Sequence, residues 1–207
     1  TYTLKLRRGV KFHDGSEMTS KDVKASYDKI IFPPAGVASD RKGEYLDVEA
    51  VQAPDPYTIV FRLKWPSGSF LMSLASPWNW IYKADILAKD MRWYETHVMG
   101  TGPFIFVEHV RGSHWVGKRN PNYWDKGKPY LDGYRAIFIQ DAGAQVAAIR
   151  GERAMIQFRG FTPAQRDGLV QALGNKITVQ ESPWNCSIQV AMNQEKKPFE
   201  DKRVRRA

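Results

Sequence analysis

Prolines and glycines interrupt this chain at short intervals, so it can form only short helices and strands. The main interruptions fall at residues 33–34, 53–56, 66–68, 100–103 and 120–122. Between them, stretches with helix and strand character follow one another without the strict strand–helix–strand rhythm of a parallel sheet. The pattern therefore predicts an α+β fold, with a mixed β-sheet and surrounding helices.

The composition excludes several classes of protein. A hydrophobic content of 43% and an aromatic content of 13% are too high for a disordered chain. A single cysteine cannot build an internal disulfide framework or a cysteine-based zinc site. No apolar run approaches the roughly 18 residues that a membrane-spanning helix needs. The 207 residues suit one large domain or two small ones.

The net charge of +9 raises the question of nucleic-acid binding. Residues 1–100 carry a net charge of +2 and residues 101–207 a net charge of +7, mostly in residues 111–135 and 196–206. Neither stretch is a continuous basic run, so we favour a solvated surface. Basic residues alternate with aromatic ones between residues 115 and 135, a pattern that also suits stacking on bases. A basic nucleic-acid-binding module therefore remains the alternative function.

Helices and strands are predicted from periodicity, caps and breakers. Thr19 or Ser20 is expected to cap a helix that ends at the two prolines, and Gly151 to end another. The predicted helices are residues 20–32, 70–74, 84–94, 142–150 and 163–173. The predicted strands are residues 2–13, 48–51, 58–63, 104–110, 113–119, 134–139, 155–158, 176–180 and 187–192.

Both ends have the pattern of an excised fragment. The first residues alternate like a strand already under way. Residues 198–207 resemble the start of a helix, with proline and acidic residues first, yet only about two turns are present. The lack of a visible signal peptide therefore says nothing about where the parent protein resides.

No catalytic or metal-binding pattern is found. His13 and Asp14 are adjacent in a predicted turn, where they more simply form the turn than bind an ion. The other histidines lack the spacing of a metal motif, and Cys186 is expected to be a small buried hydrophobe. The glycines at residues 100–102 lack the lysine of a phosphate loop. We therefore predict a protein that is not an enzyme and has no cofactor and no metal.

The aromatic loop at residues 77–80 is the first candidate ligand site. Trp78 and Trp80 flank Asn79 in a non-regular segment. Ligand clefts combine large apolar faces with a few polar groups, which this loop supplies. The alternative is that one of the tryptophans fills the core of its subdomain.

Six motifs, in order, resemble one known family. They are YTLKLRRGVKFHDG (residues 2–15), TSKDV (19–23), PDPYT with FRL (54–58, 61–63), GTGPF (100–104), RNPNYW with KPYLD (119–124, 128–132), and Asn193 with PFEDKRVRRA (198–207). The order resembles family 5 of the bacterial extracellular solute-binding proteins, the dipeptide, oligopeptide and nickel-binding type that serves ABC importers. One departure is Ala154, where the family usually has an aspartate.

This resemblance implies a periplasmic-binding-protein type II-like fold of two lobes, of which this chain would be a truncated piece. Residues 1–99 would be the extra subdomain of the first lobe. Residues 100–207 would be part of that lobe's sheet, ending at the crossing into an absent second lobe. The implied function is capture of a peptide or similar small solute for a membrane permease. The implied location is the periplasm, or the cell surface of a bacterium without an outer membrane, with no membrane insertion and no nucleic acid.

The resemblance also places two further segments near the cleft between the lobes. Phe158 and Arg159 follow a predicted short strand, and Arg159 either faces the cleft or forms a surface ion pair. Trp184 and Asn185 lie between two predicted strands, and we favour the cleft for Trp184.

Overall fold

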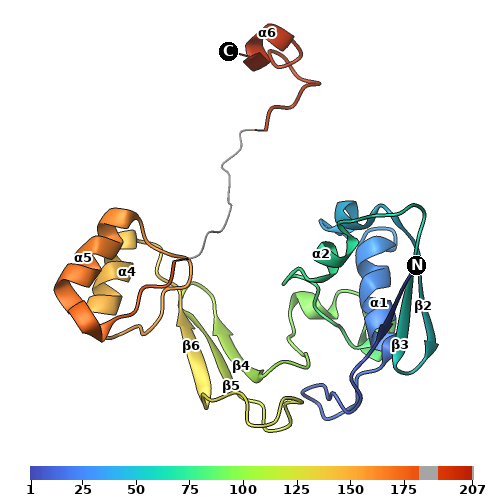
Figure 1. The fold of residues 1–207 in the computed structure, drawn as a ribbon, viewed down its shortest axis with the longest axis horizontal. Helices are drawn as coiled ribbons and strands as arrows, with labels where there is room; N and C mark the ends of the chain where they lie inside the picture. Colours follow the sequence, from blue (N-terminus) through green and yellow to red (C-terminus); the bar gives the residue numbers. More distant parts are fainter. Residues whose placement is uncertain (182–190, 207) are drawn as a thin grey trace. The chain divides into compact units, whose positions relative to one another are not determined.

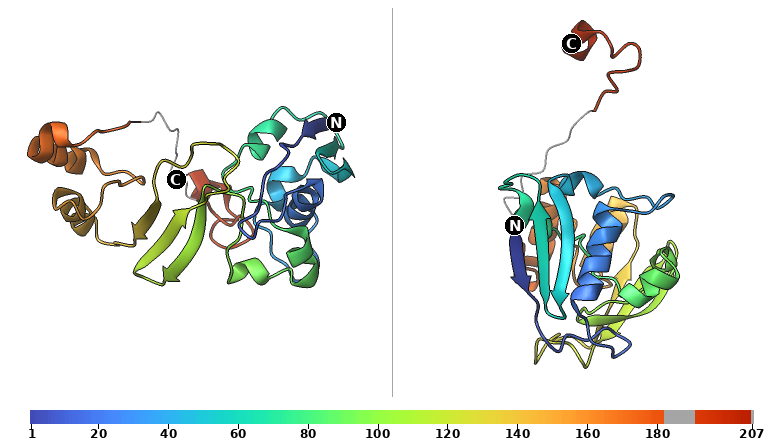
Figure 2. Two further views of the ribbon diagram at one scale, coloured as in Figure 1. Left: turned by 90° about the horizontal axis from the view of Figure 1, so that it is seen from below. Right: turned by 90° about the vertical axis from the view of Figure 1, so that its right-hand side faces the viewer.

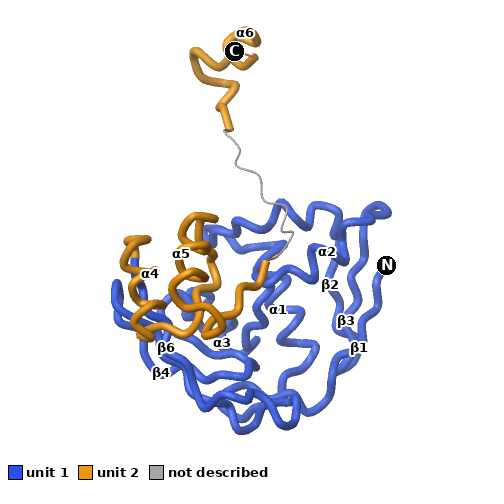
Figure 3. The backbone as a smooth tube through the Cα atoms, turned by 60° about the vertical axis from the view of Figure 1, so that its left-hand side comes forward, with its two compact units in different colours: residues 1–139 blue, residues 140–207 orange. Residues whose placement is uncertain are grey.

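The computed structural model describes residues 1–181 and 191–206 (Figure 1). Contacts within the chain divide it into two units, Thr1–Ile139 and Gln140–Ala207, which Figure 3 distinguishes by colour. The boundary expected between residues 99 and 100 concerns the lobes of a larger fold and stays a prediction. Each unit is described by itself below.

The first unit begins with a three-stranded antiparallel sheet. Its strands are β1 (Tyr2–Lys5), β2 (Val48–Asp55) and β3 (Thr58–Leu63), and β3 lies in the middle. The bounds of β3 are those predicted. β2 was expected to end at Val51, but it continues because its last residue still pairs with the first residue of β3. The chain therefore turns within only two residues between these strands.

Helix α1 (Ser20–Ile31) begins at the predicted residue and ends one residue before the predicted end. Thr19 and Asp22 form a capping box, in which the Thr19 backbone N–H donates to the Asp22 carboxylate at 2.8 Å. The helix stops before the two prolines, which cannot continue it. Local signals are sufficient to set both ends.

The core of this unit lies between α1 and the first sheet, and aromatic rings dominate it. Figure 2 shows α1 across one face of β2 and β3. The ring of Tyr27 meets those of Phe61 at 4.9 Å and Tyr45 at 5.9 Å, while Phe61 meets Phe70 at 5.3 Å. All four residues are buried. Such edge-to-face pairs stabilise a core beyond the area that they bury.

Short helices surround this core. Helix α2 (Phe70–Leu74) has the predicted bounds, and a 3₁₀ turn, η1 (Lys42–Tyr45), lies beside it. The predicted helix over residues 84–94 is instead two pieces, α3 (Ala84–Lys89) and the 3₁₀ turn η2 (Trp93–Glu95). The backbone of Asp90, extended at φ −148° and ψ 104°, separates them.

A second antiparallel sheet completes the first unit. Its strands β4 (Phe104–Val110), β5 (His114–Arg119) and β6 (Gly133–Ile137) follow one another in space as in sequence. The hairpin and its two strands were predicted. The last strand was expected to be buried, yet four of its five residues are exposed in this chain. A run of apolar residues alone does not reveal whether anything covers it.

The turn at His13 holds the glycine-rich segment against the second sheet. The His13 backbone N–H donates to the Gly100 carbonyl at 2.9 Å, and its ring Nε2 lies 3.1 Å from the Gly102 carbonyl. The Asn120 side chain donates to that same carbonyl at 2.9 Å. His13 therefore has a structural role, as predicted.

The second unit contains helices α4 (Ala142–Arg150), α5 (Pro163–Leu173) and α6 (Lys202–Arg206), with a 3₁₀ turn η3 (Gly174–Lys176). Asp141 caps α4 and Thr162 caps α5 with its side chain. Both main helices have the predicted bounds. Helix α6 begins four residues later than the expected helix start. The α4–α5 pair buries Ala148 and Leu169.

Two predicted strands of this unit are wrong. Residues 155–158 and 176–180 form no ladder, because no strand among the described residues pairs with them. A strand needs partners for its backbone groups, which sequence periodicity cannot supply. Met155 and Phe158 are accordingly 97% and 82% exposed. Most of the strand expected at residues 187–192 lies outside the described residues.

Candidate ligand-binding groove

Two exposed tryptophans form one wall of a groove on the first unit. Trp78 and Trp80 are 56% and 57% exposed, and their ring centroids lie 5.9 Å apart at an interplanar angle of 68°. Together with Tyr82 they line a space of about 480 Å³. Burial raises the pKa of the Tyr82 hydroxyl, so this wall stays uncharged at physiological pH. Neither tryptophan fills the core, which resolves that alternative.

Asn79 holds the aromatic loop in place. Its Oδ1 accepts a hydrogen bond from the hydroxyl of buried Tyr45 at 2.9 Å. Its Nδ2 donates to the carbonyls of Ser73 at 2.7 Å and Leu74 at 3.0 Å. The side chain of Asn79 thus bonds inward while its two neighbours are exposed. The amide predicted as a ligand contact is engaged with the protein itself.

The other wall comes from the end of α1 and from residues 38–44. Arg41 donates to the Ser76 hydroxyl at 2.9 Å and forms an ion pair with Glu44. Lys29 donates to the Met91 carbonyl at 2.5 Å, and its ammonium lies 5.3 Å from the centroid of the Tyr82 ring. The lining residues that close the groove are Ile30, Ala38, Ser39 and Asp40.

Sequence reasoning found two of these groove residues and missed the rest. The tryptophans stand out by composition, whereas Arg41 and Tyr82 belong to no motif. Only the fold brings the end of α1, residues 38–44 and residues 78–82 to one place. No local signal in the sequence could have joined them.

Phe158 and Arg159 belong to the second unit and are not among the residues that line this groove. In the second unit, the Arg159 guanidinium lies 5.6 Å from the centroid of the Phe158 ring, and the Arg159 backbone N–H donates to Gln157 at 2.7 Å. Both side chains are exposed. Trp184 and Asn185 lie outside the described residues. Their roles stay predictions.

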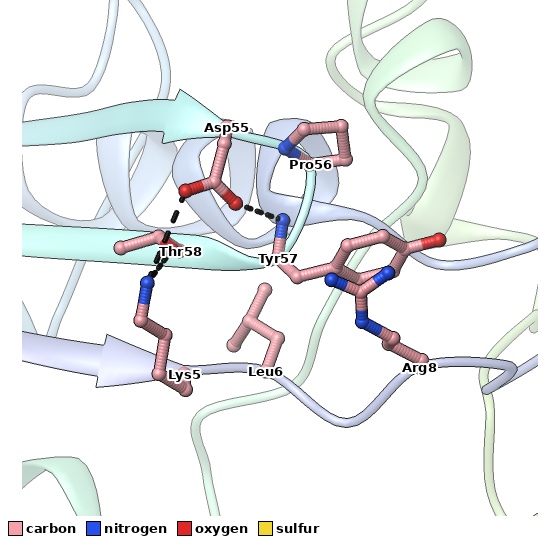
Figure 4. A pocket seen from close by; sticks show the side chains of 7 residues that line it. All are labelled: Lys5, Leu6, Arg8, Asp55, Pro56, Tyr57 and Thr58. Carbon is pink, nitrogen blue, oxygen red and sulfur yellow. Dashed lines mark hydrogen bonds and ion pairs between the residues drawn. The ribbon is translucent and has the colours of Figure 1, made fainter.

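A second pocket, of about 410 Å³, lies beside β1 and the β2–β3 turn (Figure 4). Its polar groups bond mainly to one another: Lys5 donates to Thr58 at 2.7 Å, and Asp55 accepts from the Tyr57 backbone at 2.9 Å. The Arg8 guanidinium stacks on the Tyr57 ring at 4.4 Å. These contacts brace the hairpin, so this pocket is the weaker candidate.

The part of the chain that the structure describes contains no candidate metal-binding site. There, no three histidine, cysteine, aspartate or glutamate side chains gather closely enough to hold an ion. His114 lies 3.1 Å from Glu108 and also contacts Ser113, while His97 stacks on Trp93. Among the same residues, no helix is long and apolar enough to cross a bilayer.

The basic and aromatic residues between 115 and 135 lie on strands β5 and β6 of the second sheet and in the connection between them. The Trp115 ring packs against that of Phe106 at 4.8 Å, and Arg119 lies 3.6 Å from Asp132. Arg135 contacts His114. Trp115, Arg119 and Arg135 thus have partners within the protein, and nothing in the described residues supports the nucleic-acid alternative.

The fold is that of solute-binding proteins. The oligopeptide-binding protein AppA from Bacillus subtilis, solved in complex with a nonapeptide, superimposes with a TM-score of 0.72 at 26% sequence identity. The match covers 83% of this chain and 34% of AppA. The predicted α+β fold of periplasmic-binding-protein type is thus confirmed.

The sequence identifies the family within this class. The pattern of the bacterial extracellular solute-binding proteins, family 5 (middle part), matches residues 1–207, and the chain belongs to this family. It is 30% identical to the Di/tripeptide-binding protein 2 of Pseudomonas aeruginosa and 30% identical to the Glutathione-binding protein GsiB of Escherichia coli. All of this chain is covered in both matches, but only 42% and 40% of those relatives. The chain therefore spans about two fifths of their length.

Proposed function

We propose that the protein is the solute-binding component of an ABC importer and captures a peptide-like small solute for a membrane permease. The observation that carries this proposal is the family match along the whole chain. The names of the relatives, which refer to di- and tripeptides and to glutathione, favour a short peptide as solute. The family favours a place outside the cytoplasm, in the periplasm or on the cell surface.

The proposed activity is reversible binding without catalysis. A solute that contacts two lobes stabilises the closed state through its higher affinity for that state. The permease would then recognise the closed form. The groove beside Trp78 and Trp80 would contribute part of the contact surface, because apolar walls with a few charged groups suit a small peptide.

Titration calorimetry on the complete gene product that carries residues 1–207 tests this proposal. The ligands are defined dipeptides, tripeptides, a nonapeptide and glutathione. We expect saturable binding of at least one of them, and loss of its uptake in a strain that lacks the gene. Absence of binding for every ligand, together with unchanged uptake, would contradict the proposal.

A further inference from the structure

The charged side chains that line the groove beside Trp78 and Trp80 differ in the partners that the protein itself gives them. Arg41 is only 18% exposed at its side chain, and Glu44 and Ser76 engage its guanidinium. Lys29 is engaged by the Met91 carbonyl and the Tyr82 ring. Burial lowers the pKa of Lys29, while Glu95 and Asp90 act in the opposite direction. Arg41 is therefore paired with a carboxylate, whereas Lys29 is held by a carbonyl and a ring and forms no ion pair among the described residues.

Asp40 is different. It is exposed, it lines the groove, and among the described residues no cation lies within ion-pair distance of its carboxylate. The groove thus holds a carboxylate that is available for a partner from outside.

The wall formed by Trp78 and Trp80, like the Asp40 carboxylate, favours a positively charged ligand. The face of an indole ring carries partial negative charge and attracts cations, and tryptophan does so more strongly than tyrosine or phenylalanine. Because Trp78 and Trp80 meet edge to face and both are more than half exposed, ring surface remains open to the groove. An anion would meet repulsion from both the carboxylate and the ring faces.

We propose that this groove binds a cationic group of the solute, a primary ammonium or a guanidinium, between the Trp78–Trp80 wall and the Asp40 carboxylate. The proposal rests on the proposed solute-binding function and narrows it to solutes with a positive group. In a peptide, the group is either a lysine or arginine side chain or the terminal amine. Ring and carboxylate supply the contacts that each of these cations seeks.

The first test uses small probes and does not depend on peptide binding. The complete gene product is labelled with 5-fluorotryptophan, and the fluorine resonances of Trp78 and Trp80 are assigned with W78F and W80F. n-Pentylammonium, n-pentanol and pentanoate are then titrated, since they share a chain and differ in charge. We expect both resonances to shift with pentylammonium at concentrations at which the other two leave them unchanged. Equal shifts with all three, or a stronger response to pentanoate, would overturn the proposal.

Substitution of Asp40 adds a matched control. D40N keeps the size of the side chain and removes its charge, and exposure makes the fold tolerant of the change. E49Q removes one charge from the same unit at an exposed position outside the groove, where Glu49 lies 3.4 Å from Arg62. The response to pentylammonium should weaken by about threefold or more in D40N and stay unchanged in E49Q. The same response in wild type and D40N would contradict the role of Asp40.

Tripeptides separate this inference from the broader function. Alanyl-lysyl-alanine should bind about threefold to thirtyfold more tightly than alanyl-norleucyl-alanine, with the difference reduced in D40N. If the terminal amine is the bound group, N-acetylation rather than norleucine will remove the dependence on Asp40. If neither the replacement of lysine by norleucine nor N-acetylation changes the affinity, the inference is contradicted and the solute-binding function is not. Absence of binding for all solutes contradicts the function, while the fluorine titration still decides the groove.

Discussion

The carboxylate of Asp14 accepts a hydrogen bond of 2.5 Å from the ammonium of Lys83, a residue 69 positions later in the chain. Asp14 also accepts from the backbone and the hydroxyl of Ser16, at 3.0 and 2.6 Å. Lys83 precedes helix α3, so this contact fastens the turn after His13 to the start of that helix. The turn itself is predicted from the local sequence, whereas its long-range contact with Lys83 is not.

This pair should make stability sensitive to acid. Burial raises the pKa of Asp14, but its hydrogen bonds with Lys83 and Ser16 outweigh that effect and bring the pKa to about 2. Because the folded value lies below the usual one of about 3.9, the unfolded chain binds more protons in this range. The stabilisation is therefore complete above about pH 4 and is lost as the pH falls towards 2.

Urea unfolding of the wild type and D14N between pH 7 and pH 2.5 measures this loss. Asp14 is about one-third exposed at its side chain, so we expect solvent screening to limit the difference to about 1 kcal/mol. The wild type should lose this advantage over D14N on acidification. Two curves that run parallel across the whole pH range would show that the pair does not contribute.

Removal of the Asp22 carboxylate should destabilise the first unit more strongly. One oxygen accepts from the Thr19 backbone at 2.8 Å, and the other accepts from the Ala84 backbone at 2.9 Å. D22A would leave two backbone donors without partners, and we expect it to cost about 3 kcal/mol in the free energy of unfolding. D28A is the control on the same helix, because it removes only an exposed pair with Lys24 and should cost about 0.5 kcal/mol. Equal losses in the two variants would be inconsistent with this anchoring role.

Sequence signals predict the local elements of this fold well and the long-range ones poorly. The caps at Thr19 and Thr162 set helix starts because their partners lie three residues away. The strands expected at residues 155–158 and 176–180 fail because a strand depends on a neighbour that the local sequence does not specify. The exposure of β6 escapes prediction for the same reason.

The same distinction between local and long-range features applies to the candidate site. Trp78 and Trp80 were found because aromatic residues in a non-regular loop are conspicuous. Asp40 was not found, since an isolated aspartate in a polar loop carries no signal of its own. Its significance comes from lining the same groove as the tryptophans and from the lack of an ion-pair partner for it among the described residues.

Loss of the Asn79 side chain should loosen the groove wall. N79A removes three hydrogen bonds, two to backbone carbonyls and one from the hydroxyl of Tyr45. We expect a loss of about 2 kcal/mol in stability and changed fluorine shifts for both neighbouring tryptophans. Y45F removes only one of these bonds at Asn79, together with a bond to the Ser73 carbonyl, and should disturb the two tryptophans less. An N79A protein with unaltered tryptophan shifts would show that the loop holds its shape without the amide.

Residues 1–207 alone should bind peptides weakly or not at all, even if the complete gene product binds them well. The groove of the first unit is open, whereas tight small-molecule sites bury most of the surface of their ligand. The chain spans only about two fifths of the length of its relatives, so under the proposed two-lobe mechanism much of the contact surface lies elsewhere. Calorimetry with one peptide pool on both proteins measures the difference, which we expect to exceed about a hundredfold in affinity. A far-ultraviolet circular dichroism spectrum with clear helix and strand signals serves as the control that the shorter protein is folded. Tight binding by the 207 residues alone would mean that this chain holds a complete site, and closure of two lobes would then be unnecessary for capture.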